Sequence, residues 1–351
     1  MDLKCHQEQA EKISDKQCSF AIFEVLIGKH MSTIESLQQS FESYFDHRHF
    51  PVEPETLYHP LEDFLSNSGK RIRPVLCLLG NELFDDIHPD AYHLAAAVEL
   101  FHNFTLVHDD IMDKAPLRRG KPTVHSVHGE ATALLGGDVM MVVAYDYLNK
   151  IEPQHLKKVI QLFNKTAKEV CEGQQLDMDF EKMEKVKLDE YIHMIQLKTS
   201  VLLAASLQMG SIIGGASEHN QGHLYEFGRN LGIAFQIQDD YLDAFGDPSK
   251  FGKQVGGDIQ SNKKTFLLIH ALETASGQTL VELNNLIQSN PSNKVDRVLA
   301  IYKNCKIDEW ANTLKEEYLT KAYHHLDEIA VSSSRKETLR ALAQYLIKRD
   351  K

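Results

Sequence analysis

Cysteine, secretion signals and long apolar runs are scarce or absent in this chain of 351 residues. The five cysteines, at positions 5, 18, 77, 171 and 305, are odd in number and widely spaced, so they indicate neither a zinc motif nor a disulfide framework. The most apolar run, Val201–Ala216, contains polar residues and glycines and is too short to span a bilayer. The N-terminal residues are polar and show no signal-peptide segment. We therefore expect a reduced, cytoplasmic protein without stable membrane insertion.

The chain also lacks an excess of positive charge. It has 38 lysine and arginine residues against 50 aspartate and glutamate residues, a formal charge of −12. This balance argues against nucleic acid or an anionic membrane as the main partner. The length allows two domains, but no linker divides the chain. We expect a single domain over residues 31–351, preceded by an extension over residues 1–30 that is dispensable for the chemistry.

No stretch alternates apolar and polar residues with a period of two, so strands are not expected. Apolar residues instead recur with helical spacing, which predicts an all-α bundle of long helices. The helices that matter most for function are predicted at Pro89–Met112, Ala131–Leu148, Val159–Leu176, Tyr191–Gly210 and Leu224–Phe245.

Two similar acidic clusters follow apolar helical segments, in the stretches FHNFTLVHDDIMD and FQIQDDYLD. Their carboxylates are Asp109, Asp110 and Asp113 in the first, and Asp239, Asp240 and Asp243 in the second. One such cluster is more often a solvated helix face than a site. Two clusters buried together would repel strongly, by roughly 4 kcal/mol per pair at 4 Å. We infer that divalent cations gather them, and Mg²⁺ bridging carboxylates to a diphosphate fits best.

The basic residues are also clustered rather than scattered. Lys70 and Arg73 lie in GKRIRP, where Pro74 is expected at a helix start and an anion would be favoured. Pro116 is expected to end the helix that carries the first acidic cluster, and Arg118 and Arg119 follow it closely. Lys198 lies among apolar neighbours, where it either extends to the surface or forms a buried cation facing a phosphate. A glycine-rich segment over residues 250–258, which contains Lys253, is expected to be a mobile loop.

With these motifs assembled, the chain resembles the trans-type polyprenyl diphosphate synthases of the short-chain (farnesyl and geranylgeranyl) kind. Six signatures occur in the family's order: GKRIRP, DDIMD with LRRG, GGD, GQQLD, KT, and FQIQDDYLD with a lysine-bearing glycine loop. The resemblance implies a bundle of antiparallel helices around a deep apolar cavity, usually in a homodimer. It also implies Mg²⁺-dependent condensation of isopentenyl diphosphate with an allylic diphosphate.

The resemblance assigns roles by position. Three Mg²⁺ would be held by Asp109, Asp113 and Asp239, with Asp110 and Asp243 in the same shells. The allylic diphosphate would be held by Arg118, Lys198, Thr199, Gln236, Lys253 and Lys263. Isopentenyl diphosphate would be held by Lys70, Arg73, His102 and Arg119. The direct catalytic set is then Asp109, Asp113, Asp239, Lys198 and Arg118.

Product length would be set on the helix that ends at the first cluster. Phe104 lies five residues before Asp109, about 7.5 Å along the helix axis, and Phe101 lies about 12 Å away. In the family, bulk five residues before the first aspartate marks short-chain synthases, whereas Phe101 could equally be an ordinary core residue. Thr105 is small, and the first cluster has no insertion, so we expect a product of fifteen to twenty carbons, with twenty preferred.

Three other functions remain open at this point. A terpene cyclase shares the fold and the metal chemistry, but it has no use for a second diphosphate site. A non-catalytic regulatory subunit of a prenyl synthase usually lacks one aspartate cluster, and this chain has both. An acidic metal-buffering or scaffold protein would leave the ordered basic motifs unexplained.

Overall fold

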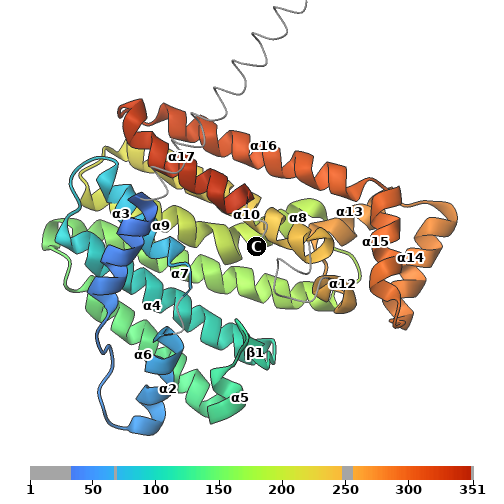
Figure 1. The fold of residues 1–351 in the computed structure, drawn as a ribbon, viewed down its shortest axis with the longest axis horizontal. Coiled ribbons are helices and arrows are strands. Elements are labelled where there is room, and N and C mark those ends of the chain that lie inside the picture. Colours follow the sequence, from blue (N-terminus) through green and yellow to red (C-terminus); the bar gives the residue numbers. More distant parts are fainter. Residues whose placement is uncertain (1–32, 67–68, 247–255, 349–351) are drawn as a thin grey trace, which may run out of the picture.

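The computed structural model describes residues 33–66, 69–246 and 256–348, and these residues are almost entirely helical (Figure 1). A helix over residues 33–45 is followed by α2 (Glu55–Ser66), α3 (Ile72–Glu82), α4 (Pro89–Met112), α5 (Val124–His128), α6 (Glu130–Leu148), α7 (Pro153–Lys182), α8 (Leu188–Ile195), the π-helix η1 (Gln196–Ser200), α9 (Val201–Ile213), α10 (Glu218–Phe245), α12 (Gly257–Gln260), α13 (Phe266–Thr274), α14 (Gly277–Ser289), α15 (Lys294–Asn304), α16 (Ile307–Glu328) and α17 (Ser333–Lys348). The predicted all-α class is confirmed.

Helix α9 lies at the centre of the bundle. Its residues are apolar on all sides and almost all are buried, which is the composition of a helix surrounded by other helices. It contacts α3, α4, α7 and α10. Figure 1 shows α6 beside α4 and α16 beside α10. Helices α6 and α16 therefore lie outside α4 and α10, on the sides away from α9. Both α4 and α10, which carry the acidic clusters at their C-terminal ends, therefore pack against the same central helix.

The prediction that the chain contains no strands was wrong at one place. Leu117–Arg118 (β1) pairs antiparallel with Lys121–Pro122 (β2) in a two-residue hairpin. The two residues between them, Arg119 and Gly120, have φ of 53° and 76°. Positive φ at both central residues matches the twist of a tight hairpin. Strands of two residues are too short to show a periodic pattern, which is why the sequence did not reveal them.

Several predicted helix bounds were also wrong. The helix predicted at Val159–Leu176 runs from Pro153 to Lys182, because Pro153 opens its first turn and Gly173 does not end it. The helix predicted at Tyr191–Gly210 is divided into α8, η1 and α9. Helix α3 begins at Ile72, so Pro74 lies in its first turn rather than at its first residue. The other helices whose bounds differ from the prediction are extended by one to six residues.

The glycines of the GGD motif allow close packing of α6. A Cβ atom on Gly137 would lie 2.2 Å from Nε2 of His108 on α4, and one on Gly136 would lie 2.5 Å from Leu61. Helix α6 is the one helix of the described chain that is long and apolar enough to cross a membrane by length and composition alone. Its outward face exposes Leu134, Leu135 and Val142.

Candidate active site

The first acidic cluster lies at the C-terminal end of α4. Asp113 caps the helix, and its backbone N–H donates to the carbonyl of Asp109 at 2.8 Å. Burial raises the pKa of Asp109 to about 6, and the charge of Lys198 opposes this shift. Asp113 is exposed. The pair therefore presents one desolvated and one solvated carboxylate, a turn apart, at the end of the helix.

Asp110 points to the hairpin. It is 1% exposed, and its Oδ1 accepts hydrogen bonds from Nε and Nη2 of Arg118 at 2.8 and 2.7 Å. Burial raises the pKa of Asp110, while Arg118 lowers it, and the net shift is upward. Its Oδ2 is buried without a hydrogen-bond partner among the residues that the structure describes. The hairpin thus places Arg118 against the first cluster.

The second acidic cluster lies on the last turns of α10. Asp240 is buried and accepts hydrogen bonds from the Tyr191 hydroxyl and from Nε2 of Gln236, the latter at 2.9 Å. Burial raises its pKa, although Lys263 and these two donors lower it. Oδ2 of Asp243 accepts from the backbone N–H of Asp258 at 3.0 Å. The carboxylates of Asp240 and Asp243 therefore both accept hydrogen bonds from other groups of the protein.

Two lysines connect the clusters electrostatically. Lys198 forms an ion pair of 2.6 Å with Asp177 on α7 and also lowers the pKa of Asp109. Burial alone would lower the pKa of Lys263. Four carboxylates raise it by more than burial lowers it, so the net shift is upward; they belong to Asp258, Asp177, Asp240 and Asp113.

Asp113 belongs to the first cluster and Asp240 to the second, so both clusters act on the same ammonium group. The pKa of Asp177 is lowered although burial alone would raise it, because Lys263 and Lys198 both favour its charged form. The structure therefore gathers an alternating set of carboxylates and ammonium groups between the ends of α4 and α10.

A short hydrogen-bonded chain crosses from η1 to α10. The Thr199 hydroxyl donates to Oε1 of Gln236 at 3.1 Å, and Gln236 in turn donates to Asp240. A Cβ on Gly173 of α7 would lie 2.3 Å from the backbone nitrogen of Lys198, so the two backbones touch at this point. The π-helix is frequently found at functional sites, and here it presents Lys198 and Thr199.

A cavity of about 790 Å³ lies between the N-terminal end of α3, α4 and the end of α10. Its lining includes Lys70, Arg73, His102, Arg119, Gln236, Asp239, Asp243 and Lys263. The four residues predicted for isopentenyl diphosphate thus share one cavity with residues predicted for the metals and for the allylic diphosphate. Its lining combines cations with carboxylates, whereas Asp109, Asp113, Arg118 and Lys198 are not among its lining residues.

His102 is neutral and accepts a hydrogen bond from Arg73. Nη1 of Arg73 lies 3.1 Å from Nε2 of His102. Burial, together with the charges of Arg73 and Arg119, holds the pKa of His102 well below its usual value. Arg73 remains a cation although burial lowers its pKa to about 10, and its Nε is buried with no partner among the described residues. Such an unsatisfied donor is costly unless an anion accepts from it.

Arg71, between the two predicted binding residues, has a different role. Its guanidinium forms a buried ion pair with Glu99 and donates to the carbonyl of Leu65 at 2.8 Å. Its backbone has φ of 47°, in the left-handed region, immediately before α3. Arg71 therefore fixes the loop, and its neighbours Lys70 and Arg73 line the cavity together with it.

Sequence reasoning did not single out Asp177, Tyr191 or Asp258. Asp177 lies one turn after Gly173 in GQQLD, so its motif was a usable signal. No sequence signal pointed to Tyr191, because its hydrogen bond with Asp240 joins residues 49 positions apart. Burial raises the pKa of Asp258 to about 7, with Lys263 opposing the shift. Lys253 lies outside the described residues.

The residues predicted to set product length lie in an aromatic cluster. Phe101 is 1% exposed and its ring lies 5.6 Å from that of Phe104 and 5.3 Å from that of Phe163. Phe104 is half-buried and contacts His108. The Thr105 hydroxyl donates to the carbonyl of His102 at 2.8 Å. Phe101 is thus a core residue in this state, and Phe104 lies nearer the surface of the core.

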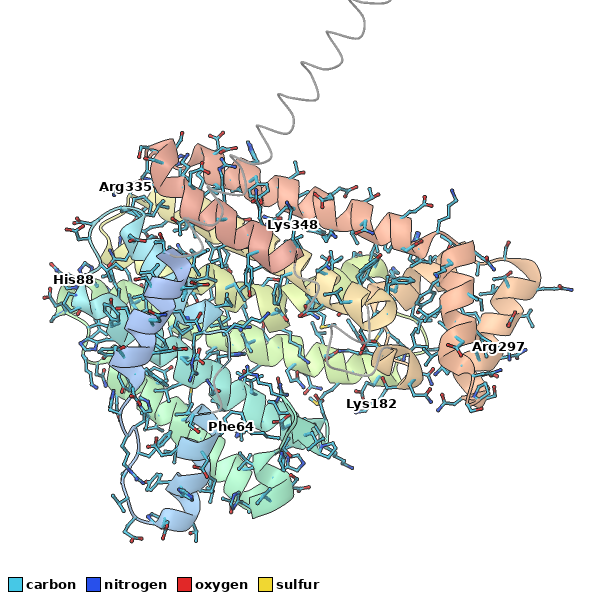
Figure 2. The ribbon with its side chains drawn as sticks, viewed as in Figure 1. Phe64, His88, Lys182, Arg297, Arg335 and Lys348 are labelled. Carbon is cyan, nitrogen blue, oxygen red and sulfur yellow. The ribbon has the colours of Figure 1, made fainter. Side chains whose placement is uncertain are left out.

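A separate group of two carboxylates and one imidazole, spaced as metal ligands can be, lies at the other end of α4. The ligand atoms of Asp90, Glu152 and His155 lie within 4.8 Å of one another. Figure 2 labels His88, the N-cap of α4, at the end of the bundle opposite Lys182. This group is distinct from the aspartate clusters. Asp90 there accepts the backbone N–H of Glu152, which joins the starts of α4 and α7.

The family comparison agrees with the fold and the site. The polyprenyl synthetase family model matches residues 54–305, and the chain belongs to this family. It is therefore a prenyltransferase of the prenyl diphosphate synthase type.

Individual relatives agree. The chain is 37% identical to a short chain isoprenyl diphosphate synthase of Methanothermobacter thermautotrophicus, over 85% of this chain and 92% of the relative. It is 39% identical to a geranylgeranyl diphosphate synthase of Saccharolobus solfataricus, over 81% and 87%. A crystal structure of a geranylgeranyl pyrophosphate synthase superimposes with a TM-score of 0.86 at 40% identity, over 90% of this chain and 98% of that one.

Proposed function

We propose that this protein joins isopentenyl diphosphate head-to-tail to an allylic diphosphate and releases diphosphate. The observation that carries the proposal is the single cavity in which Lys70, Arg73 and Arg119 face carboxylates of the second cluster. In this proposal one group of basic residues binds each diphosphate, and the carboxylates would bind the cations that lie between the two diphosphates. A site for only one diphosphate would not need both basic groups.

Isopentenyl diphosphate binds to Lys70, Arg73 and Arg119 in this proposal. The free Nε of Arg73 donates to a phosphate oxygen, and neutral His102 orients the guanidinium by accepting from Nη1. Charge-assisted bonds of this kind are short and about twice as strong as neutral ones. Arg71 contributes indirectly, because its pair with Glu99 fixes the loop that carries Lys70.

The allylic diphosphate binds between Lys198, Thr199, Gln236 and Lys263, with Arg118 and Lys253 completing the set. Asp109, Asp113 and Asp239 would hold three Mg²⁺, with Asp110 and Asp243 supporting them. The raised pKa of Asp109 and the crowded carboxylates fit a site that is stabilised by added cations. When bound, Mg²⁺ would draw electrons from the diphosphate and favour its departure.

In the reaction, the bond between the allylic carbon and the diphosphate oxygen breaks. The double bond of isopentenyl diphosphate then attacks the allylic cation, and a carbon–carbon bond forms. A proton leaves the new chain, and the departing diphosphate accepts it. The side chains bind, orient and exclude water, and none acts as a nucleophile.

We propose a product of fifteen to twenty carbons, with twenty preferred. Phe104, whose ring is half-buried, lies one and a half turns before Asp109 and would form the floor of the chain cavity. The names of the relatives support a short-chain product, because they include geranylgeranyl diphosphate synthases.

We further propose a cytoplasmic homodimer. Cys77, Cys171 and Cys305 are unpaired thiols, as expected in a reducing compartment. The exposed Leu134, Leu135 and Val142 lie on one side of α6, with the exposed Asp138 between them, and burial against a second copy would remove these apolar side chains from water. A terpene cyclase or a non-catalytic regulatory subunit would share the fold, but the family match and the presence of both aspartate clusters favour the condensation enzyme.

The test is incubation with isopentenyl diphosphate and Mg²⁺, with dimethylallyl, geranyl or farnesyl diphosphate as the second substrate. Chromatography of the dephosphorylated products should give linear prenols of up to twenty carbons. Cyclic hydrocarbons formed without consumption of isopentenyl diphosphate would identify a cyclase. Absence of any product with all three starters would favour the regulatory subunit.

A further inference from the structure

Three histidines gather far from the diphosphate site, where α10 begins and α16 ends. His219 and His223 lie four residues apart in the first turns of α10, so they share one face of that helix. His325 lies in the last turn of α16, which runs beside α10 (Figure 1). Asp239 of the second cluster is about 30 Å further along α10. The proposed reaction uses none of these histidines.

Two of the imidazoles already stand at the spacing of metal ligands. Nδ1 of His223 lies 3.1 Å from Nδ1 of His325, and the ring of His219 lies 4.5 Å from that of His223. Two imidazole nitrogens bound at 2.0–2.1 Å to one ion are about 3.3–3.4 Å apart in tetrahedral geometry and about 2.8–3.0 Å apart in octahedral geometry, so the observed distance lies between the two. The alternative is one N–H···N hydrogen bond between neutral rings, which leaves His219 without a role.

The space around the imidazoles can hold an ion and its waters. A hollow of about 580 Å³ is lined by all three histidines together with Glu218 and Glu226. Gly222 lies at its edge, and a Cβ there would meet nothing within 4 Å. The hollow is open on one side to solvent, so an ion has a path of entry.

Two carboxylates, those of Glu218 and Glu226, and one ammonium group, that of Lys165, line the hollow, so its charged lining is negative on balance. Glu226 lies one turn after His223 and acts electrostatically on His325, although Nη2 of Arg229 lies 2.5 Å from one of its oxygens. Burial lowers the pKa of His325, which favours the neutral imidazole that binds metals. The C-terminal end of α16 carries partial negative charge, which favours a cation beside His325.

We propose that His219, His223 and His325, with Glu226 as a fourth ligand, bind one divalent transition-metal ion of the zinc class. Imidazole nitrogens prefer Zn²⁺, Co²⁺ or Ni²⁺ over Mg²⁺, which takes oxygen ligands. The site is therefore chemically separate from the aspartate clusters. The bound ion joins the start of α10 to the end of α16 and stabilises the C-terminal helices.

The test uses the full chain without a polyhistidine tag, stripped of metal with a chelator and titrated with Co²⁺ in excess Mg²⁺. The expected result is one equivalent of Co²⁺ bound with the visible absorption of nitrogen ligation, displaced by Zn²⁺, and a raised Tm. A variant that combines Asp109→Ala with Asp239→Ala should keep this absorption. That control separates the histidine site from the catalytic clusters and from the proposed function.

His223→Gln and His325→Gln should each weaken Co²⁺ binding by more than the 10–100-fold that follows loss of an outer-shell partner. His324→Gln is the matched control, because His324 is an exposed neighbour outside the hollow, and it should bind as the unmodified chain does. Unchanged binding in His325→Gln would overturn the proposal. Absence of Co²⁺ absorption in the unmodified chain would also overturn it, whatever the folding of the variants.

Discussion

Asp177 on α7 and Lys198 on the π-helix η1 are joined by an ion pair of 2.6 Å. The pair lies one turn from Gly173, where the two backbones meet. Because the contact is between backbones, the position of Lys198 is set by helix packing as well as by charge. The residue that faces the first aspartate cluster is thus held from two sides.

Gly173→Ala should displace η1 and lower activity. The added methyl would lie 2.3 Å from the backbone nitrogen of Lys198, and overpacking of this kind costs about 1–3 kcal/mol. Gly222→Ala is the control, because nothing lies near its Cβ, and its stability should be unchanged or raised by up to about 1 kcal/mol. Urea unfolding and turnover of both variants measure this. Equal stability and turnover of the two variants would show that the contact does not position Lys198.

The two basic groups should affect different substrates. Lys70→Ala and Arg73→Ala should raise the KM for isopentenyl diphosphate about tenfold or more, since each removes a charge-assisted bond. Lys198→Ala should raise the KM for the allylic substrate instead. Steady-state kinetics with each substrate varied in turn measures both effects. Equal changes for the two substrates would contradict the assignment of two diphosphate sites.

Phe104→Ala should lengthen the product by opening the floor of the chain cavity. Phe101→Ala should mainly destabilise the fold, by about 3–5 kcal/mol, because that ring is 1% exposed and packs against Phe163. Chromatography after dephosphorylation measures chain length, and thermal unfolding measures stability. A product of unchanged length from Phe104→Ala would remove Phe104 as the floor.

His49 should make the fold sensitive to acid. Burial, with a smaller contribution from His47, lowers its pKa to about 4. The unfolded chain takes up a proton near pH 6.5 while the folded chain does not, so stability falls as the pH drops from about 6.5 to about 4. The loss from this group is at most about 3 kcal/mol.

His49→Asn should flatten the dependence of the free energy of unfolding on pH in that range by up to about 1.4 kcal/mol per pH unit. His59→Asn is the control, since that side chain is 61% exposed. Urea unfolding at a series of pH values measures both. The same pH dependence in His49→Asn and the unmodified chain would refute this role.

The sequence predicted the large elements well because they carry strong periodic patterns. The bounds Pro89–Met112 were reproduced, and both acidic clusters lie at the ends of their helices as expected. The break at η1 was not predictable, since Lys198 and Thr199 continue an apolar helical pattern. It arises where Gly173 of α7 meets the backbone of η1, which only the assembled fold shows.

In the candidate site, too, the sequence identified the charged residues but not the separate role of each. Lys70, Arg71 and Arg73 are equivalent cations in the sequence, but their roles differ in the fold. A carboxylate 28 residues away, Glu99, pairs with Arg71, and the neutral imidazole of His102 orients Arg73. Distant partners decide such roles, and local patterns do not contain them.

The central claim is that both aspartate clusters serve one condensation reaction. The most direct measurement is steady-state turnover of Asp109→Ala and Asp239→Ala with isopentenyl and geranyl diphosphates in Mg²⁺, alongside their helical circular dichroism. We predict that each substitution lowers turnover at least about 100-fold with an unchanged helical signal, because each removes a proposed metal ligand while relieving repulsion between carboxylates. Near-normal turnover of either variant would contradict the account.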